Sequence, residues 1–344
     1  MKFTEDDARE VLVAYHSLLG EVQRPGRNPL STPVSLERAD VPFLVANRKD
    51  YVVSPKADGH RAALFFTKTS NCGYVAVAID RALAVRLVRS RGPRRAFDAG
   101  TILDCERVKD AYLIFDVLVC MGEDVRALDY LSRLDRARAL TAQVELIDQG
   151  RHARLRVKEV TPLAELQQLL EAMPRLTYGT DGVVMTPVRA AVRAGTHRGM
   201  FKLKTQHSID LQVRLKSREL LVGVGGGPST AVARSPLPLE SGLAVDDDFW
   251  PLAEALGLVE DGIVECALSL QGRAIVMSAH RLRSDKSHPN SLETVRRTLV
   301  NVRENITMAE LIAALDEREW QAPDERAPEW QAPKRARLHA PEGH

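Results

Sequence analysis

The sequence has little of what marks a secreted, membrane or cysteine-based metal protein. Its four cysteines, Cys72, Cys105, Cys120 and Cys266, lie far apart and form no C-x-x-C pair. This spacing excludes a zinc ribbon built from cysteines and offers no disulfide framework, which fits a reducing compartment. The apolar run YLIFDVLVCM is interrupted by Asp116 and is too short to span a bilayer.

The chain also lacks a large excess of positive or negative charge, because its formal net charge is only +2. A protein coated in basic residues is therefore excluded, and any contact with nucleic acid should be a local groove. The N-terminus carries acids at Glu5, Asp6 and Asp7 and has helical spacing, unlike a signal peptide. With 344 residues, the chain predicts a soluble intracellular protein of two domains, without a membrane segment.

The stretch YVVSPKADGHRAALFF, residues 51–66, places Lys56 between two apolar, strand-like runs. Asp58 follows two residues later and Arg61 five residues later. Burial beside other cations would lower the pKa of such a lysine and make its amine available for covalent chemistry. The alternative is that Asp58-Gly59 forms a hairpin turn whose flanking charges lie in solvent.

Residues 4–19 predict an amphipathic helix capped by Thr4, and short apolar runs between residues 51 and 121 predict strands. In the strand TILDCERV, Asp104 and Glu106 share one face because side chains alternate with a period of two. Asp116 lies inside an apolar run, where an unpaired charge is costly. Both a functional role and a buried salt bridge would satisfy it.

Residues 123–149 predict a helix, and residues 153–162 predict a strand with Lys158 near its end. Further on, Asp181-Gly182 precedes the strand VVMTP, and the strand MFKLK places Lys202 and Lys204 on one face. Two neighbouring ammonium groups repel each other unless an anion such as a phosphate lies between them. A solvated edge strand is the alternative for these lysines.

After about residue 206 the strands are separated by Gly-rich or acidic loops, which is consistent with a small β-barrel of the OB type. GVGGGPS is not a P-loop, since it lacks the Lys-Ser/Thr ending and a following helix. Arg283, Asp285 and Lys286 crowd a short basic segment before two more helical patterns. The tail contains EWQAP twice and four prolines, which predicts disorder.

The motifs in their order resemble one family. They are K-x-D-G-x-R at 56–61, D-x-E at 104–106, F-D at 115–116, D-G-V-V at 181–184, K-L-K at 202–204 and R-x-D-K-x-x-P-N at 283–290. This series resembles the covalent nucleotidyltransferases, which include mRNA capping enzymes and polynucleotide ligases. PVSLER at 33–38, GTHRGMFKLK at 195–204 and EDGIVEC at 260–266 resemble the capping guanylyltransferases more than the ligases.

The resemblance implies an α+β protein with four parts. They are a nucleotidyltransferase domain of antiparallel sheets and flanking helices at 1–206, an OB-fold domain at 207–290, C-terminal helices at 291–316 that pack back on the first domain, and a disordered tail at 317–344. It also implies a two-step guanylyl transfer, in which Lys56 takes GMP from GTP and passes it to a 5′-diphosphate RNA to make the G(5′)ppp(5′)N cap.

The resemblance also assigns roles to the motif residues. Lys56 is the nucleophile, and Mg²⁺ or Mn²⁺ is held by Asp58, Glu106 and Asp181, partly through water. The nucleotide-binding residues are Arg61 and Glu106 at the ribose, Phe115 and Lys158 at the guanine, Lys202 and Lys204 at the α-phosphate, and Arg283 and Lys286 at the β- and γ-phosphates. Asp116 and Asp285 would be supporting residues.

Two departures from the family pattern stand out: Cys105 replaces the usual glycine of the third motif, and Arg273 follows Gly272 where tryptophan is usual. Separate chains are expected to supply RNA triphosphatase and cap methyltransferase, and an RNA polymerase contact is a further expectation. The length suits a DNA virus or a unicellular eukaryote, in a nucleus, in cytoplasm or in a viral factory. The rival hypotheses are an ATP-dependent ligase and a catalytically silent RNA-binding factor.

Overall fold

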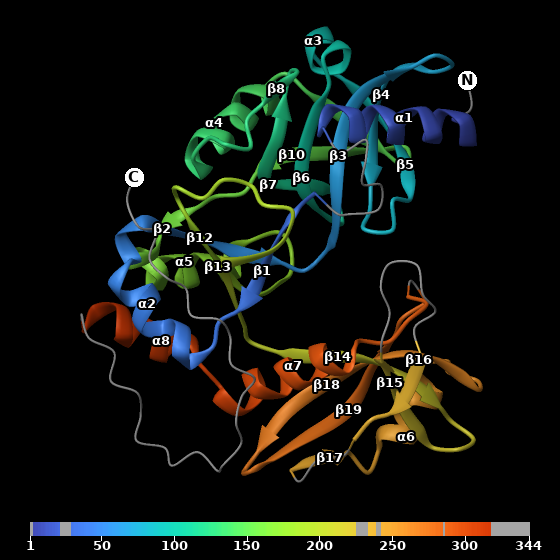
Figure 1. The fold of residues 1–344 in the computed structure, drawn as a ribbon, viewed down its shortest axis with the longest axis vertical. Helices are drawn as coiled ribbons and strands as arrows, with labels where there is room; N and C mark the ends of the chain where they lie inside the picture. The colour runs from blue at the N-terminus through green and yellow to red at the C-terminus, as the bar shows by residue number, and fades with distance from the viewer. Residues whose placement is uncertain (1–2, 21–28, 225–232, 239–241, 285, 318–344) are drawn as a thin grey trace. The chain divides into compact units, whose positions relative to one another are not determined.

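The computed structural model describes residues 3–20, 29–224, 233–238, 242–284 and 286–317. The described residues form two compact units: residues up to 206 together with 306–317, and residues 207–305. Both units combine helices with mostly antiparallel sheets, which confirms the predicted α+β class (Figure 1). Asp285 and almost all of the predicted disordered tail, from residue 318 on, lie outside the described residues. None of the described helices is long and apolar enough to cross a membrane.

An eight-stranded sheet in the first unit closes into a barrel, because β10 pairs with β7 as well as with β9. In sheet order its strands are β10 (Arg151–Val157), β9 (Glu145–Asp148), β5 (Val85–Arg91), β4 (Gly73–Ile79), β3 (His60–Thr69), β6 (Thr101–Val108), β7 (Ala111–Cys120) and β8 (Glu123–Asp124).

Both faces of the central barrel strands are buried. Leu64 and Phe66 of β3 pack in the barrel interior, while the alternate residues Ala63 and Phe65 pack outside against α1 (Glu5–Leu18). This double burial explains why β3 reads as a continuous apolar run. Thr4 caps α1 as the sequence predicted, since its hydroxyl accepts a hydrogen bond from the Asp7 amide.

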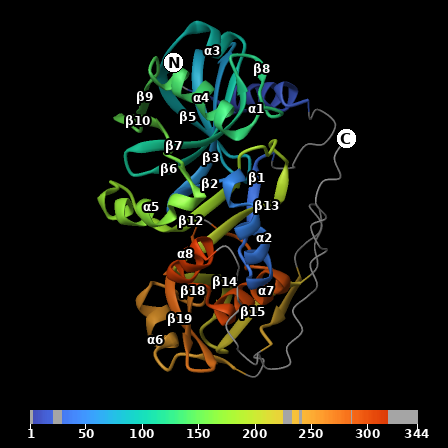
Figure 2. The ribbon, with the colours of Figure 1, turned by 90° about the vertical axis from the view of Figure 1, so that its left-hand side faces the viewer.

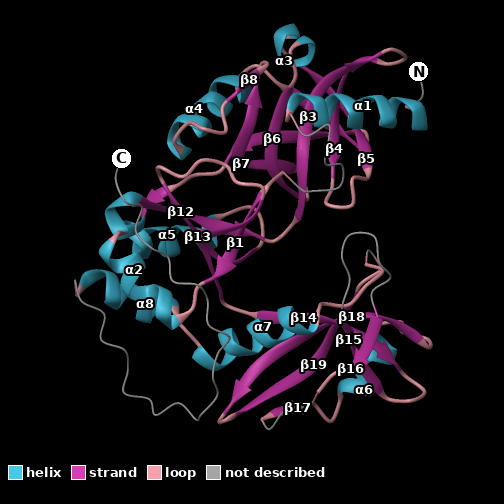
Figure 3. Cartoon of the chain, in the orientation of Figure 1, coloured by secondary structure: helices cyan, strands magenta, loops and turns pink. Residues whose placement is uncertain are grey.

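A five-stranded sheet forms the rest of the β-structure of this unit. Its order is β1 (Ser31–Ser35), β13 (Gly195–Lys204), β12 (Thr180–Pro187), β2 (Tyr51–Ala57) and β11 (Thr161–Pro162). The unit's other α-helices are α2 (Val41–Ala46), α3 (Arg94–Asp98), α4 (Tyr130–Thr141), α5 (Leu166–Ala172) and α8 (Met308–Asp316). Figure 3 shows α2, α5 and α8 gathered beside this sheet. The 3-10 helices are Arg38–Asp40, Arg48–Asp50, Leu163–Glu165 and Met173–Arg175.

The second unit is a six-stranded sheet with two helices and its own apolar core. The strand order is β16 (Ala233–Pro236), β15 (Glu219–Val224), β14 (His207–Arg214), β18 (Asp261–Gln271), β19 (Ala274–Leu282) and β17 (Leu243–Val245). The helices are α6 (Phe249–Ala255) and α7 (Leu292–Glu304). Phe249 of α6 and Val295 of α7 are both fully enclosed in that core.

Two features differ from the sequence-based expectations. Residues 145–148 are a strand rather than the end of a helix, because β9 fills the gap between β5 and β10 and completes the barrel. The helices expected at 291–316 divide between the units. α7 packs on β14, β15 and β18 of the second unit, whereas α8 lies beside α2 of the first, as Figure 2 shows, with Arg38 Nη1 2.6 Å from Glu310 Oε1.

Candidate active site

Lys56 lies where the chain passes from one sheet to another. β2, which carries Lys56, belongs to the five-stranded sheet, and β3, which follows after Asp58-Gly59, belongs to the barrel. The hairpin alternative for residues 58–59 is therefore wrong. Gly59 is needed at this crossing because a Cβ atom there would lie 2.4 Å from the carbonyl oxygen of Arg107.

Asp181 bridges two of the predicted lysines. Its Oδ1 lies 2.7 Å from Lys56 Nζ, and its Oδ2 lies 3.0 Å from Lys204 Nζ. Burial alone would raise the pKa of Asp181, but Lys204 and Lys56 hold it below its usual value. Gly182 lets the strand approach so closely, since a Cβ there would lie 2.0 Å from the Leu203 oxygen and φ is +141°.

Lys202 adds a third ammonium group to this site. β13 lies between β1 and β12, so the edge-strand alternative for Lys202 and Lys204 is wrong. Burial, followed by the charges of Lys204, Lys56 and Arg81, lowers the pKa of Lys202 to about 8. The excess of cations around one carboxylate is what a bound polyphosphate would neutralise.

Two further cations lie over the ring of Phe115. The guanidinium of Arg61 lies 5.1 Å from the centre of the Phe115 ring, and Lys158 Nζ lies 5.6 Å from it. Arg61 is held in place by Asp104, with Nε to Oδ1 at 3.0 Å and Nη2 to Oδ2 at 2.5 Å, and by the Ser31 carbonyl at 2.7 Å. These three predicted nucleotide-binding residues therefore lie together.

Glu106 faces this group from β6. Burial raises its pKa to about 7, although Lys56, Lys158 and Arg61 each act to lower it. Burial likewise lowers the pKa of Lys158 to about 8, while Glu106 acts to raise it. Cys105 is fully buried in the barrel interior, so the departure from the family's glycine lies on the opposite face of β6 from Glu106.

Asp116 has the structural role that the sequence left open. Its Oδ1 lies 2.6 Å from Arg133 Nε and its Oδ2 lies 3.0 Å from Arg133 Nη2. Arg133 also donates to the carbonyls of Leu128 and Ala190. Asp116 therefore ties β7 to α4 at the residue next to Phe115.

The predicted metal ligands do not form a closed cage. Among the described residues, no three His, Cys, Asp or Glu side chains lie close enough together to hold a metal ion. Asp58 is exposed, whereas Glu106 and Asp181 are partly buried near Lys56. One or two carboxylates completed by substrate phosphates and water is how proteins usually bind Mg²⁺, so Glu106 and Asp181 fit that ion.

Arg283 and Lys286 lie in the second unit, where both contact Asp210 of β14. Arg283 Nη1 lies 3.1 Å from Asp210 Oδ1, and Lys286 forms an ion pair with Asp210 Oδ2. Asn290 completes this motif, because its side-chain oxygen accepts the Asp210 amide at 2.8 Å. Their predicted phosphate contacts stay a prediction.

The sequence analysis gave no role to three residues that interact with the predicted site residues, two in the first unit and one in the second. Arg81, in the turn between β4 and β5, interacts electrostatically with Lys202 and Glu106, and no sequence signal singles it out. Asp104 was noted on its strand but given no role, although it holds Arg61. Asp210 could have been found by the signal that drew attention to Asp116, a single acid within an apolar strand.

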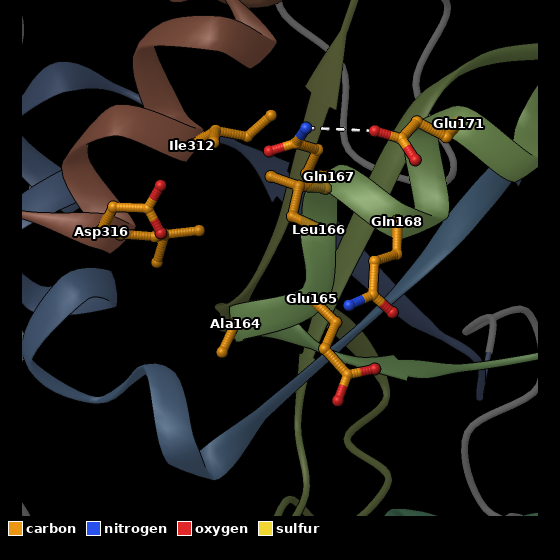
Figure 4. A pocket seen from close by; sticks show the side chains of 9 residues that line it. Ala164, Glu165, Leu166, Gln167, Gln168, Glu171, Ile312 and Asp316 are labelled. Atoms are coloured by element: carbon orange, nitrogen blue, oxygen red, sulfur yellow. Dashed lines mark hydrogen bonds between the residues drawn. The ribbon is translucent and has the colours of Figure 1, made fainter.

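A separate pocket of about 310 Å³ lies between α5 and α8 (Figure 4). None of the predicted site residues lines it. Its rim carries Glu165, Glu171 and Asp316, and a hydrogen bond of 3.1 Å joins Gln167 to Glu171. A rim of carboxylates repels phosphate, so this pocket does not suit a nucleotide.

Comparison with known proteins gives matches over both units. Residues 1–206 match the family model of the mRNA capping enzyme catalytic domain, and residues 204–312 match that of the mRNA capping enzyme C-terminal domain. The mRNA-capping enzyme subunit alpha of Schizosaccharomyces pombe is 25% identical over 350 residues, covering 89% of this chain and 84% of the relative. Its namesake in Neurospora crassa is 24% identical over 347 residues, covering 83% and 84%.

Among solved structures, a mycobacterial DNA ligase D complexed with ATP and MES matches with a TM-score of 0.40 and 14% identity, covering 75% of this chain and 96% of the ligase. A likeness at that level carries no inference about substrate. The family model of the catalytic domain, in contrast, spans more than half of the chain and all the site residues of the first unit. The chain therefore belongs to the mRNA capping enzyme family.

Proposed function

We propose that this nucleotidyltransferase is an mRNA guanylyltransferase that carries GMP on Lys56. The observation that carries the proposal is the position of the Lys56 amine, 2.7 Å from Asp181, beside Lys204 and Lys202. Membership of the capping family supports GTP as the nucleotide and RNA as the acceptor. The relatives are named as subunits, which supports RNA triphosphatase and cap methyltransferase activities on other chains.

In the first step the lone pair of Lys56 Nζ attacks the α-phosphorus of GTP. A nitrogen–phosphorus bond forms, the nitrogen releases a proton to solvent, the bond to the pyrophosphate oxygen breaks, and pyrophosphate leaves. Phosphoryl chemistry asks the protein mainly for positioning and for stabilisation of developing charge. Lys202 and Lys204 supply positive charge beside Lys56, and Asp181 positions the attacking amine.

In the second step a terminal phosphate oxygen of a 5′-diphosphate RNA attacks the same phosphorus. The nitrogen–phosphorus bond breaks, the Lys56 amine leaves and takes up a proton, and the capped RNA is released. The resulting Lys56 ammonium group again forms its ion pair with Asp181. The same group of lysines serves both steps because the reacting phosphorus stays in one place.

Phe115 and Lys158 form the nucleoside side of the proposed site. The partly buried Phe115 ring would stack on a purine in place of a cation that now lies over it, and the Lys158 ammonium can donate to a guanine carbonyl oxygen. Arg61 and Glu106 lie between this side and Lys56, which suits contacts to the ribose. Glu106 and Asp181 would hold Mg²⁺ or Mn²⁺, which would neutralise phosphate charge.

The test is covalent labelling with α-labelled GTP and divalent metal. The wild-type chain should retain label on denaturing gels, and Lys56→Ala should abolish it while circular dichroism stays unchanged. Lys49→Ala is the matched control, since Lys49 is an exposed lysine on the preceding 3-10 helix and should not alter labelling.

The same experiment separates the two rival functions. Label retained from ATP but not from GTP would contradict the guanylyltransferase and identify a ligase-like enzyme. Failure of both nucleotides to label the chain, with Lys56→Ala making no difference, would instead indicate a catalytically silent RNA-binding factor.

A further inference from the structure

A row of cations with no role in the proposed reaction lies along the outer face of β10, and the strand register connects it to the proposed site. Glu106 of β6 pairs with Leu113 of β7, and Leu113 pairs with Arg156 of β10. Residues paired directly across strands point to the same face of a sheet, so Arg156 lies on the same outer face as Glu106. Two strand spacings separate them, or about 10 Å.

The other cations of the row lie on β10, on both sides of Arg156. His152, Arg154 and Arg156 alternate with Ala153, Leu155 and Val157, which pack toward the barrel interior. By the same period of two, the next outward position after Arg156 is Lys158, whose ammonium lies 5.6 Å from the Phe115 ring. Successive cations along the row are therefore about 6.6 Å apart and lead to the proposed nucleoside site.

Two neighbouring strands widen the row into a surface. His152 pairs with Ile147 of β9, and Ile147 pairs with Arg89 of β5, which places Arg89 and Arg91 on the same outer face. All five of these cationic or titratable side chains are exposed. We call this surface the arginine face; its members are Arg89, Arg91, His152, Arg154 and Arg156.

The arginine face has few counter-charges. Arg154 forms an ion pair with Asp110, and Glu145 lies opposite Arg91 in the strand register. Among the described residues, Arg89, Arg91 and Arg156 form no ion pair. The barrel interior differs, because there Asp148 contacts both Arg86 and Arg107.

An aromatic side chain adjoins the same surface. Tyr178 is partly buried against Ala57, Ala111 and Leu113, and these last two residues pair with Arg154 and Arg156 of β10. A ring beside a line of guanidinium groups is the combination by which proteins bind single-stranded nucleic acid, with stacking for a base and charge for the backbone.

We propose that the arginine face binds the sugar-phosphate backbone of the RNA acceptor behind its 5′ end. Guanidinium groups match phosphate oxygens in a bidentate geometry, and their regular repeat along β10 suits a chain of phosphates. The row ends at Lys158. Glu106 interacts electrostatically with both Lys158 and Lys56, and the 5′ end of an acceptor must arrive at the phosphorus on Lys56. This inference rests on the proposed function for the identity of the acceptor, and on the sheet register for the surface itself.

The test compares two charge-matched triple variants. The face variant is Arg89→Gln, Arg91→Gln and Arg156→Gln; the control variant is Arg9→Gln, Arg138→Gln and Arg175→Gln, three exposed arginines of the same unit outside the arginine face. Binding of a single-stranded 5′-diphosphate RNA of about 20 nucleotides is measured by fluorescence anisotropy at several salt concentrations. The face variant should bind at least about tenfold more weakly and lower the salt slope of log K by about 2, the loss of roughly three phosphate contacts.

Two activity measurements separate this inference from the proposed function. Covalent GMP labelling should be equal in wild type, face variant and control variant. GMP transfer to a diphosphate dinucleotide should also be unchanged in the face variant, whereas KM for the long acceptor should rise about tenfold. If wild type itself takes no GMP, the proposed function fails, and the anisotropy measurement still decides whether the arginine face binds RNA.

Three results would overturn the inference. The first is unchanged RNA affinity of the face variant, and the second is an equal loss in the control variant, which would reflect net charge alone. The third is a face variant that loses affinity for an acidic phosphoserine peptide while its RNA affinity stays the same. That result would assign the arginine face to a protein partner.

Discussion

At the residue scale, the site is organised by two partly buried carboxylates with different surroundings. Asp181 accepts two lysines directly, and they hold its pKa below the usual value even though burial acts to raise it. Glu106 is more strongly affected by burial, which raises its pKa to about 7. Asp181 therefore stays charged at neutral pH, whereas Glu106 changes its protonation state there.

Asp181→Asn should slow covalent labelling about 10²-fold, because it removes the charge that positions Lys56 and Lys204. Asp58→Asn is the comparison: the exposed Asp58 forms no ion pair with the described residues, so the loss should be less than about tenfold. Single-turnover labelling rates measure both variants. Equal losses would mean that the two carboxylates share one role, against the geometry.

Glu106→Gln should abolish labelling and yet stabilise the fold at alkaline pH. The folded state binds the Glu106 proton more tightly than the unfolded state, whose pKa is near 4.5, so the stability of the protonated form is lost as pH rises from 4.5 to about 7. A neutral glutamine avoids this loss, which amounts to up to about 3 kcal/mol at pH 8. Urea unfolding at about pH 4 should show little difference and at about pH 8 a clear gain; a uniform effect would contradict the assignment.

At the scale of elements, the site depends on contacts that hold strands and helices in register. β2, β12 and β13 meet around Lys56, Asp181 and Lys204, and Gly182 permits that approach. β7 presents Phe115 outward while its next residue, Asp116, is anchored to α4 through Arg133. A substitution at Gly182 or Asp116 would therefore displace site residues that it does not contact directly.

Asp116→Ala should lower the free energy of unfolding by about 3–5 kcal/mol, because it leaves Arg133 buried without its counter-charge. The double variant Asp116→Leu with Arg133→Met should recover part of that loss by removing both charges. Urea unfolding measures both. A double variant as unstable as the sum of the single ones would show that the pair contributes more than the avoidance of an unpaired charge.

At the scale of the whole molecule, α8, the last helix in the described part of the chain, belongs with the N-terminal unit. α8 packs beside α2, Arg38 pairs with Glu310, and Leu311 is completely buried. The first unit therefore includes residues that follow the described part of the second unit, His207–Asn305, in the sequence.

Leu311→Ala should consequently destabilise the first unit by about 2–5 kcal/mol, the usual cost of a cavity in a core. Glu310→Gln, which removes only a partly exposed ion pair, should cost less than about 1 kcal/mol. Thermal unfolding followed by loss of GMP labelling reports on the first unit. Unchanged labelling stability in Leu311→Ala would contradict the role of α8.

The sequence by itself identified residues that the structure brings together, such as Lys56, Glu106, Asp181 and Lys202, because residue type and local spacing mark them. The spacing of its apolar residues also predicted the positions of most strands and helices. Residues 145–148 were misassigned, since helical spacing there ignores the barrel gap that only β5 and β10 create.

Only the tertiary structure decided what depends on contacts between distant segments. It separated β2 from β3 into different sheets, paired Asp116 with Arg133 and Arg61 with Asp104, and brought Arg81 near Lys202. It also aligned Arg89 and Arg156 on one outer face, through a register that joins β5, β9, β10 and β7. Strand register and ion pairing are long-range choices among many compatible partners, and a period of two within one strand cannot make them.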